Sequence, residues 1–318
     1  MRLLRFCVVT LAFAWATHGF ALQAPGQSTE KIVRFPSEKS LGWLEVMDAQ
    51  MDWREAFEHI DFPSRETSRQ LRGEFAIPSN KKLLLLFFDS NASERKVPVD
   101  LSPLDQFDSD DLLILLIPAS IIGADEISHL TRHKALRYLV LGPLSTVSDA
   151  ALEHVGKITW LEGLDIADTN ATDAGLKHLR TLKNLEKLNL YGTKMTDQAI
   201  QVVIGLPRLQ TLNLGRTKVT DAGLEILASA DALESLDLQG TKISEIGITH
   251  LKGLPELTSL NLRDTSITDR QLQSVLMLPK LRRIYLGTNQ INDTMRKEFQ
   301  QLMPGLRIIV PKTPPMEP

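Results

Sequence analysis

A pattern of 24 residues repeats through most of the chain and limits its fold more than any other feature. The series L-x-x-L-x-L-x-x-T opens, at intervals of 24 residues, at Leu161, Leu185, Leu209, Leu233 and Leu257. It extends to Leu281 and, with degraded ends, back to Leu136 and Leu112, which makes eight units, and Leu306 opens a last half-unit. A fixed period of this length is typical of a solenoid, because each unit buries its apolar face only against its neighbours.

The two halves of each unit have different periods. The first half alternates apolar and polar residues, as in Leu188-Asn-Leu190, which predicts a short strand with its leucines on one face. The second half spaces its apolar residues by three, as in Leu176, Leu179 and Leu182, which predicts the buried stripe of a short helix. The expected fold is an α/β leucine-rich-repeat solenoid, with a curved parallel sheet on the concave side and helices on the convex side.

A hydroxyl residue followed by an acid marks the junction between the two halves. The pairs are Ser148-Asp149, Thr172-Asp173, Thr196-Asp197, Thr220-Asp221, Ser244-Glu245 and Thr268-Asp269. A ladder of calcium sites is one interpretation of these repeated acids. We favour helix capping, in which the hydroxyl accepts from exposed N–H groups and the acid lies at the positive end of the helix.

The repeat motif resembles a known family. The phrase Thr220-Asp-Ala-Gly-Leu224, with L-x-x-L-x-L-x-x-T before it, is similar to the 24-residue leucine-rich repeats of the GALA or ribonuclease-inhibitor-like type, over about residues 112–310. Repeats of this form are common in exported bacterial proteins of planctomycete type. The resemblance implies protein–protein interaction and no more specific task, because folds of this kind serve many functions.

The segments outside the repeats suggest an exported protein with a small cap. Residues 1–21 combine the basic Arg2 and Arg5, an apolar stretch and a Gly19-Phe-Ala21 end, which predicts a cleaved secretory signal. An uncleaved anchor is the alternative. Cleavage would remove Cys7, the single cysteine, and leave a periplasmic or extracellular chain without a thiol. Residues 311–318 are proline-rich and are expected to be extended or disordered.

Residues 22–100 do not repeat and are expected to form a β-rich N-terminal module, followed by the leucine-rich-repeat domain at 101–310. Strands are predicted at Trp43–Met47, Glu74–Ile77 and Leu83–Phe88, with a turn at Pro78–Asn80. Such a module would cover the first open strand edge of the array, which otherwise invites aggregation.

Composition and motifs argue against several function classes. The formal net charge is −3 and there is no basic run, so nucleic acid is not an expected partner. His129, His154 and His178 share one helix offset, but stacked helices hold them too far apart for one metal ion. The acidic run at 105–111 lacks the glycine and distal glutamate of an EF-hand and is expected to be a solvated turn. No catalytic motif is present, and we expect no enzyme activity, cofactor or metal.

The candidate site lies on the predicted concave face. A polar ladder occupies the position between the strand leucines at Asp165, Asn189, Asn213, Asp237 and Asn261. Binding is one explanation of this ladder, but we favour a simple compositional preference of this repeat type for Asp and Asn at that position. The large side chains predicted to face the same way are Tyr138, Tyr191, Tyr285, Arg216, Arg263 and Arg283, with Asp168 and Asp264 beside them. Tyrosine and arginine dominate binding hot spots.

The predicted function is non-enzymatic binding of a protein or peptide on the concave face. Binding is expected to centre on Tyr191, Arg216, Arg263 and Tyr285, because the N-terminal strands expose Leu116 and other apolar residues that the preceding module would cover. One alternative is a carbohydrate or cell-envelope binder that uses the Asp/Asn ladder. Another is a ubiquitin-ligase adaptor, which needs a helical F-box-like segment where this chain is expected to be β-rich.

Overall fold

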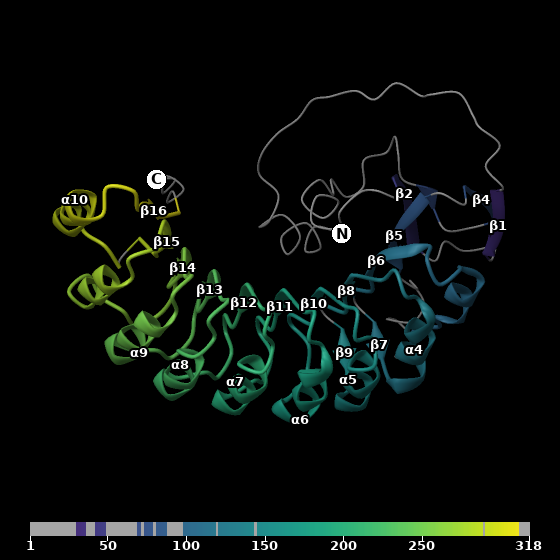
Figure 1. Ribbon diagram of the computed structural model, residues 1–318, viewed down its shortest axis with the longest axis horizontal. Coiled ribbons are helices and arrows are strands. Elements are labelled where there is room, and N and C mark those ends of the chain that lie inside the picture. The colour runs from purple at the N-terminus through teal and green to yellow at the C-terminus, as the bar shows by residue number, and fades with distance from the viewer. Residues whose placement is uncertain are drawn as a thin grey trace, which may run out of the picture. The chain divides into compact units, whose positions relative to one another are not determined.

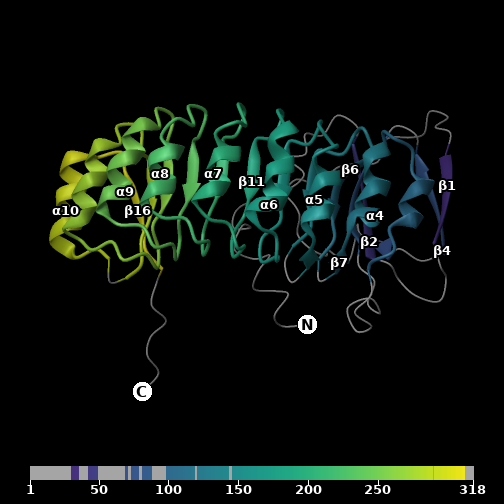
Figure 2. The same cartoon turned by 90° about the horizontal axis from the view of Figure 1, so that it is seen from below.

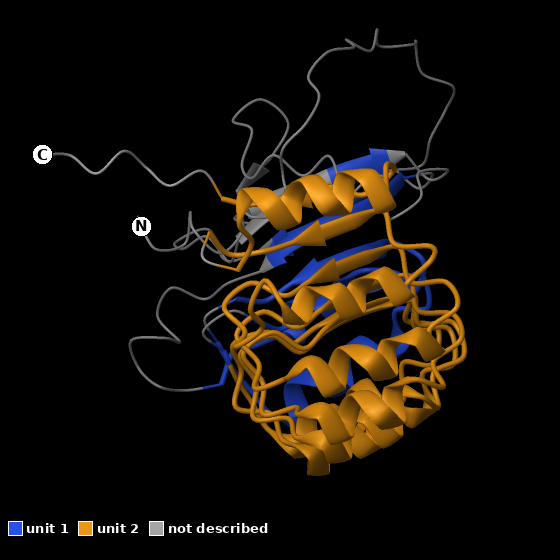
Figure 3. Ribbon diagram, turned by 90° about the vertical axis from the view of Figure 1, so that its left-hand side faces the viewer, with its two compact units in different colours: residues 1–145 blue, residues 146–318 orange. Residues whose placement is uncertain are grey.

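The computed structural model describes residues 30–35, 42–48, 69–70, 73–78, 81–87, 98–118, 120–142, 145–288 and 290–311. The chain divides into two compact units, unit 1 at Met1–Ser145 and unit 2 at Thr146–Pro318 (Figure 3). The expected signal segment and the tail beyond residue 311 lie outside the described residues, as does most of the Pro78–Asn80 turn. The expected module boundary at residue 100 therefore stays a prediction.

Unit 1 contains the non-repeating segment and the first repeats. Its strands are β1 (Glu30–Phe35), β2 (Gly42–Asp48), β3 (Arg69–Gln70), β4 (Gly73–Pro78), β5 (Lys81–Phe87), β6 (Leu112–Leu116), β7 (Ile121–Ile122) and β8 (Tyr138–Val140). Its helices are η2 (Ser102–Gln106), α4 (Ala124–Ser128) and η3 (His129–Arg132), where η marks a 3-10 helix. The three strands predicted in the module are present as β2, β4 and β5, and β1 and β3 were not predicted.

The N-terminal strands continue the sheet of the repeats. Strand β5 pairs in parallel with β6, and β6 pairs in parallel with β8. On its other edge β5 pairs antiparallel with β2, while β4 pairs antiparallel with β1. The first repeat strand therefore has no open edge, which confirms that part of the prediction.

Unit 2 consists of regular repeats. Its strands are β9 (Thr146–Val147), β10 (Gly163–Asp165), β11 (Lys187–Asn189), β12 (Thr211–Asn213), β13 (Ser235–Asp237), β14 (Ser259–Asn261), β15 (Arg283–Tyr285) and β16 (Arg307–Ile309). Its helices are α5 (Asp149–Val155), α6 (Asp173–Leu176), η4 (Lys177–Thr181), α7 (Asp197–Val203), α8 (Asp221–Leu227), α9 (Glu245–His250), η5 (Leu251–Gly253), η6 (Gln271–Met277) and α10 (Asp293–Leu302).

Strands and helices form two layers in unit 2. Strands β10 to β16 pair in parallel, each with the next, and line the inner side of the curved unit (Figure 1). The helices lie side by side on its outer side (Figure 2). The leucines predicted to face the core do so: Leu188, Leu190, Leu212 and Leu214 are at most 2% exposed. The leucine-rich-repeat solenoid is therefore confirmed.

The threonine that ends each motif has a structural task. Thr193, Thr217 and Thr241 are buried, and each hydroxyl donates to the backbone carbonyl three residues earlier at 2.6 Å. Thr265 makes the same bond to Leu262, and the amide of Gln290 in the next repeat donates both to the Leu262 carbonyl and to the Thr265 hydroxyl. These bonds satisfy polar groups that burial would otherwise leave costly.

The acids at the strand–helix junctions join successive repeats. Each carboxylate accepts from both the backbone N–H and the hydroxyl of the Thr or Ser in the next repeat, and the acids are Asp149, Asp173, Asp197 and Asp221. The predicted helix caps are present at Ser148, Thr172, Thr196 and Ser244.

Two of the predicted caps are wrong. The Thr220 side chain makes no cap hydrogen bond to α8. Its hydroxyl donates to Asp197, as the hydroxyls of the capping residues Thr172 and Thr196 also donate to their preceding acids. At the following junction Glu245 occupies the position of the aspartates in the other repeats. It accepts a hydrogen bond from the Ser274 hydroxyl and none from Thr268. The helix after Thr268 is the 3-10 helix η6, whose N-cap is Arg270 and not Thr268.

Candidate functional site

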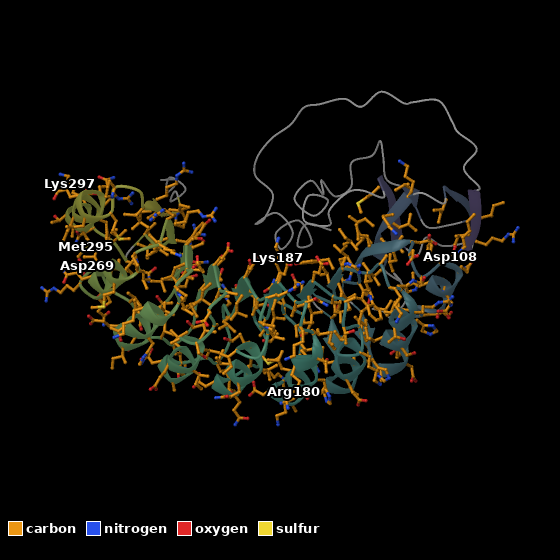
Figure 4. All side chains as sticks on the ribbon, viewed as in Figure 1. Asp108, Arg180, Lys187, Asp269, Met295 and Lys297 are labelled. Carbon is orange, nitrogen blue, oxygen red and sulfur yellow. The ribbon has the colours of Figure 1, made fainter. Side chains whose placement is uncertain are left out.

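The concave face of unit 2 is formed by the side chains of β10 to β16, and of the turns that follow these strands, that point away from the helices. Lys187 on β11 extends to this inner side, and Arg180 of η4 extends to the outer side (Figure 4). Because the strand leucines enter the core, the residues on either side of them lie on this face.

The Asp/Asn ladder of this face is held largely by its own hydrogen bonds. One side-chain oxygen of each ladder residue accepts from the backbone N–H two residues later, at 2.8–3.1 Å, in Asp165, Asn189, Asn213, Asp237 and Asn261. The amides of Asn189 and Asn261 also donate to the carboxylates of the preceding repeats, Asp165 and Asp237, both at 2.8 Å. The ladder therefore fixes the turn after each strand, which is a structural reason for these residue types.

The two half-buried aspartates of the ladder have raised pKa values. Desolvation raises the pKa of Asp165, against the lowering effect of hydrogen bonds from the Ala167 N–H and the Asn189 amide. Desolvation also raises the pKa of Asp237, although two similar hydrogen bonds and the charge of Arg263 act in the opposite sense. Both groups therefore bind a proton more readily in the folded chain than an exposed aspartate does.

Tyr191 and Arg216 form the central contact of the face. The Arg216 guanidinium carbon lies 5.6 Å from the centroid of the Tyr191 ring, which is within cation–π range. Gly215 makes room for the ring, because a Cβ on that residue would stand 2.6 Å from Tyr191 Cδ2. Desolvation raises the pKa of the Tyr191 hydroxyl, and the Arg216 charge acts against this shift. Arg216 itself is exposed.

A second pair repeats this arrangement further along unit 2. The Arg263 guanidinium carbon lies 5.2 Å from the centroid of the Tyr285 ring. The Nε of Arg263 is buried and has no hydrogen-bond partner within the described residues. Next to this pair the Gln239 amide donates to Asp264 at 2.8 Å. Four of the predicted residues are thus brought together as two Arg–Tyr stacks.

One position per repeat places the turn backbone in the left-handed region. The residues there are Asp168, Gly192, Arg216, Gly240 and Asp264, with φ between 53° and 68°. Each glycine leaves room for the side chain at the same position of the preceding repeat. A Cβ on Gly192, for example, would stand 2.1 Å from Asp168 Oδ1. Charged residues in a conformation that favours glycine are uncommon, and they cluster at functional sites.

Tyr138 departs from the predicted site. It belongs to unit 1, where it is 5% exposed in a cluster with Met47, Leu84 and Val140, against which Leu116 packs. The N-terminal strands therefore cover the apolar residues at this end, as predicted, and they cover Tyr138 as well. Its side chain is not available to a partner in the way that the sequence suggested.

The acidic run at 105–111 binds groups of its own unit. Asp105 accepts from His129 at 2.9 Å and lies 3.6 Å from Arg132. Asp108 and Asp111 form ion pairs with Lys31 at 2.6 and 3.7 Å. Within the described residues no group of three or more His, Cys, Asp or Glu side chains could hold a metal ion.

Sequence reasoning missed several residues of this surface. Gly215 and Gln239 each contact a predicted residue, and Arg307 is the register partner of Arg283. In other repeats, the positions equivalent to these three are occupied by residues that were predicted for the site. An alignment of the repeats with one another would therefore have identified all three. The described helices include none that is long and apolar enough to cross a membrane.

Comparisons with known proteins agree with this fold. Family models described as leucine rich repeats match residues 231–291 and 206–228. No curated protein matches the chain. The internalin inlF of Listeria monocytogenes is similar in structure, with a TM-score of 0.52 and 20% identity over 69% of this chain and 58% of that chain. The internalin inlC2 of the same organism has a TM-score of 0.46 and 22% identity over 70% of this chain and 91% of its own.

These findings define the class of protein. The chain contains leucine-rich repeats and has the leucine-rich-repeat solenoid fold. It spans 58% of the length of the inlF chain, and the low identity means that this likeness shows the fold alone. The matched family models indicate no catalytic family.

Proposed function

We propose that this chain is a non-enzymatic, extracytoplasmic interaction module that binds a protein or peptide on the concave face of unit 2. The observation that carries the proposal is the pair of Arg–Tyr stacks, Arg216 on Tyr191 and Arg263 on Tyr285. Large side chains that are already ordered on a rigid sheet lose little further conformational entropy when a partner binds. Arginine and tyrosine also contribute most to binding at protein interfaces.

The Asp/Asn ladder favours a protein partner over a sugar. Sugar hydroxyls are bound by amide and carboxylate groups that are free to exchange hydrogen bonds. Asp165, Asn189, Asp237 and Asn261 already bind one another or the following turns. The described residues between 30 and 87 form strands, which gives no support to a helical adaptor segment.

A selection experiment tests the concave face. Random peptides displayed on phage are selected on the purified chain, and the affinity of each enriched peptide is measured by fluorescence anisotropy. The double variant Tyr191→Ala/Arg216→Ala should lose more than about 1 kcal/mol of binding free energy. His178→Ala, on the exposed outer side, is the control and should bind normally. Failure to enrich any peptide, or equal binding by both variants, would contradict the proposal.

The proposed location has its own test. Residues 1–21 have the charge and apolar pattern of a secretory signal. The native protein should therefore appear in an extracytoplasmic fraction, and N-terminal sequencing should begin at Leu22. Recovery in the cytoplasmic fraction with residues 1–21 intact would contradict this part of the proposal.

A further inference from the structure

Two arginines lie side by side at the C-terminal end of the concave face. Arg283 of β15 and Arg307 of β16 are register partners in a parallel pair, and both are exposed. Ile284 lies in the core, so Arg283 and Tyr285 point to the opposite, concave side. Neighbouring strands are about 4.8 Å apart, so the two positive charges are close.

The charges of this pair are not neutralised within the described residues. Neither Arg283 nor Arg307 forms an ion pair with a described carboxylate. Like charges directly opposite each other on a sheet destabilise the fold. An anionic group between the two guanidinium groups would accept charge-assisted hydrogen bonds from both and remove this repulsion.

The neighbours of the pair suit a peptide more than a free ion. Tyr285 and Ile309 are register partners one position further along the same face, and both are half-buried. Arg263 adds a third guanidinium, stacked on Tyr285. Asp264, in the turn after β14, accepts a hydrogen bond from the Gln239 amide. The surface thus places cationic and apolar groups in adjacent rows. A peptide can contact both rows, because its neighbouring side chains can be acidic and apolar.

The other end of the face carries two aspartates, beside Lys187 of the next strand, β11. Asp165 lies on β10, Asp168 is exposed in the turn after it, and the charge of Asp168 acts on Asp165. A long polyanion such as a nucleic acid would meet the repulsion of these two carboxylates when it extended along the strands toward β10. A protein segment avoids this repulsion, since only the part over β15 and β16 needs to be acidic.

We infer that the end of the concave face formed by Arg263, Arg283, Tyr285 and Arg307 binds an acidic segment of the partner protein. Aspartate or glutamate carboxylates accept from the Arg283 and Arg307 guanidinium groups, and an apolar side chain next to them contacts Tyr285 and Ile309. The inference rests on the proposed function of the concave face and specifies the chemistry of its partner.

Two pools of short fluorescent peptides test the inference on the full chain. Both pools have random flanking positions; one has Asp-Glu-Asp at its centre and the other has the uncharged Asn-Gln-Asn. The acidic pool should bind at least about tenfold more tightly, with an affinity that falls as salt increases. Equal binding of the two pools, or no binding of the acidic pool, overturns the inference.

Matched variants locate the binding. Arg283→Gln/Arg307→Gln should lower the affinity for the acidic pool by at least about tenfold. Lys177→Gln/Arg180→Gln removes the same charge from the outer side and should change it by less than about twofold. Circular dichroism should show that both variants are folded. Equal losses in the two variants would show a general charge effect and overturn the inference.

Further probes separate this inference from the proposed function and from a phosphate site. If display-selected peptides depend on Tyr191 and Arg216 but the acidic pool does not depend on Arg283 and Arg307, the proposed function stands and the inference fails. If neither set of peptides depends on the concave face, both fail. Single-stranded DNA and inorganic polyphosphate should bind more weakly than the acidic pool. Tighter binding of either polyanion would contradict the inference.

Discussion

The carboxylate of Asp197 accepts two hydrogen bonds from Thr220 of the next repeat, from its backbone N–H and from its hydroxyl, both at 2.7 Å. The same double contact links Asp149 to Thr172, Asp173 to Thr196 and Asp221 to Ser244. The conspicuous acids of the repeat therefore connect neighbouring units.

Asp197→Ala should lower the free energy of unfolding by about 1.5–3 kcal/mol, because it leaves the Thr220 N–H and hydroxyl without their charged acceptor. Equilibrium urea unfolding measures the loss. Asp231→Ala removes an exposed carboxylate that makes no hydrogen bond within the described part of the chain, and it should change stability by less than about 0.5 kcal/mol. Equal effects of the two changes would refute a special role for the inter-repeat contact.

The raised pKa of Asp165 predicts a pH dependence of stability. Its folded pKa lies above the ordinary value of 3.8, so the folded chain binds more protons than the unfolded chain between these two values. The contribution of Asp165 to stability therefore falls as pH rises from about 3.8 through the folded pKa. Urea unfolding across this range should show the fall in the wild type, and Asp165→Asn should lack that component. Identical pH profiles would contradict the prediction.

Gly215→Ala should impair binding without removing any functional group. The new Cβ would stand 2.6 Å from Tyr191 Cδ2 and so must displace the ring from its place beside Arg216. We expect display-selected peptides to bind more weakly by about 1 kcal/mol, which anisotropy measures. Gly205→Ala adds the same methyl group on the exposed outer side and is the control. Unchanged affinity of the Gly215 variant would show that the stacked geometry does not matter.

Arg307→Gln should raise the free energy of unfolding by about 0.2–1 kcal/mol, because it removes a like charge directly opposite Arg283. The gain should shrink in high salt, since exposed charges are screened there. Arg180→Gln, which removes an exposed charge from the outer side, should not increase stability in this way. A loss of stability in Arg307→Gln at low salt would show that the two guanidinium groups do not repel each other in the folded chain.

The solenoid could be predicted from the sequence because its signal is periodic. Burial of Leu188 and Leu212 follows from alternation and a 24-residue register, and both are fully or almost fully buried. Hydrogen-bond partners 23 residues apart are harder to predict. The sequence shows that an acid recurs at the position of Asp197 in each repeat, but it does not show which groups donate to that acid. Periodicity likewise predicts a side-chain helix cap at Thr220, where the hydroxyl donates to the preceding repeat and makes no cap hydrogen bond.

The candidate site could be predicted only in part. Column positions in the repeat placed Tyr191, Arg216, Arg263 and Tyr285 correctly on one face, where they form two stacks. Tyr138 also occupies a repeat position that faces the concave side, but strands outside the repeat bury it. Periodicity cannot predict this burial, because those strands do not repeat.

Hydroxyl-radical footprinting of the chain with its tightest display-selected peptide tests the central claim most directly. Tyr191 and Tyr285 lie on the concave face, while Ile246 and Met277 are exposed on the helix side at 64% and 55%. All four side chains react with hydroxyl radicals when solvent reaches them. The account predicts that the peptide protects the two tyrosines and leaves Ile246 and Met277 as reactive as in the free chain. Protection of Ile246 or Met277, with both tyrosines unchanged, would place the binding surface on the helices and contradict the account.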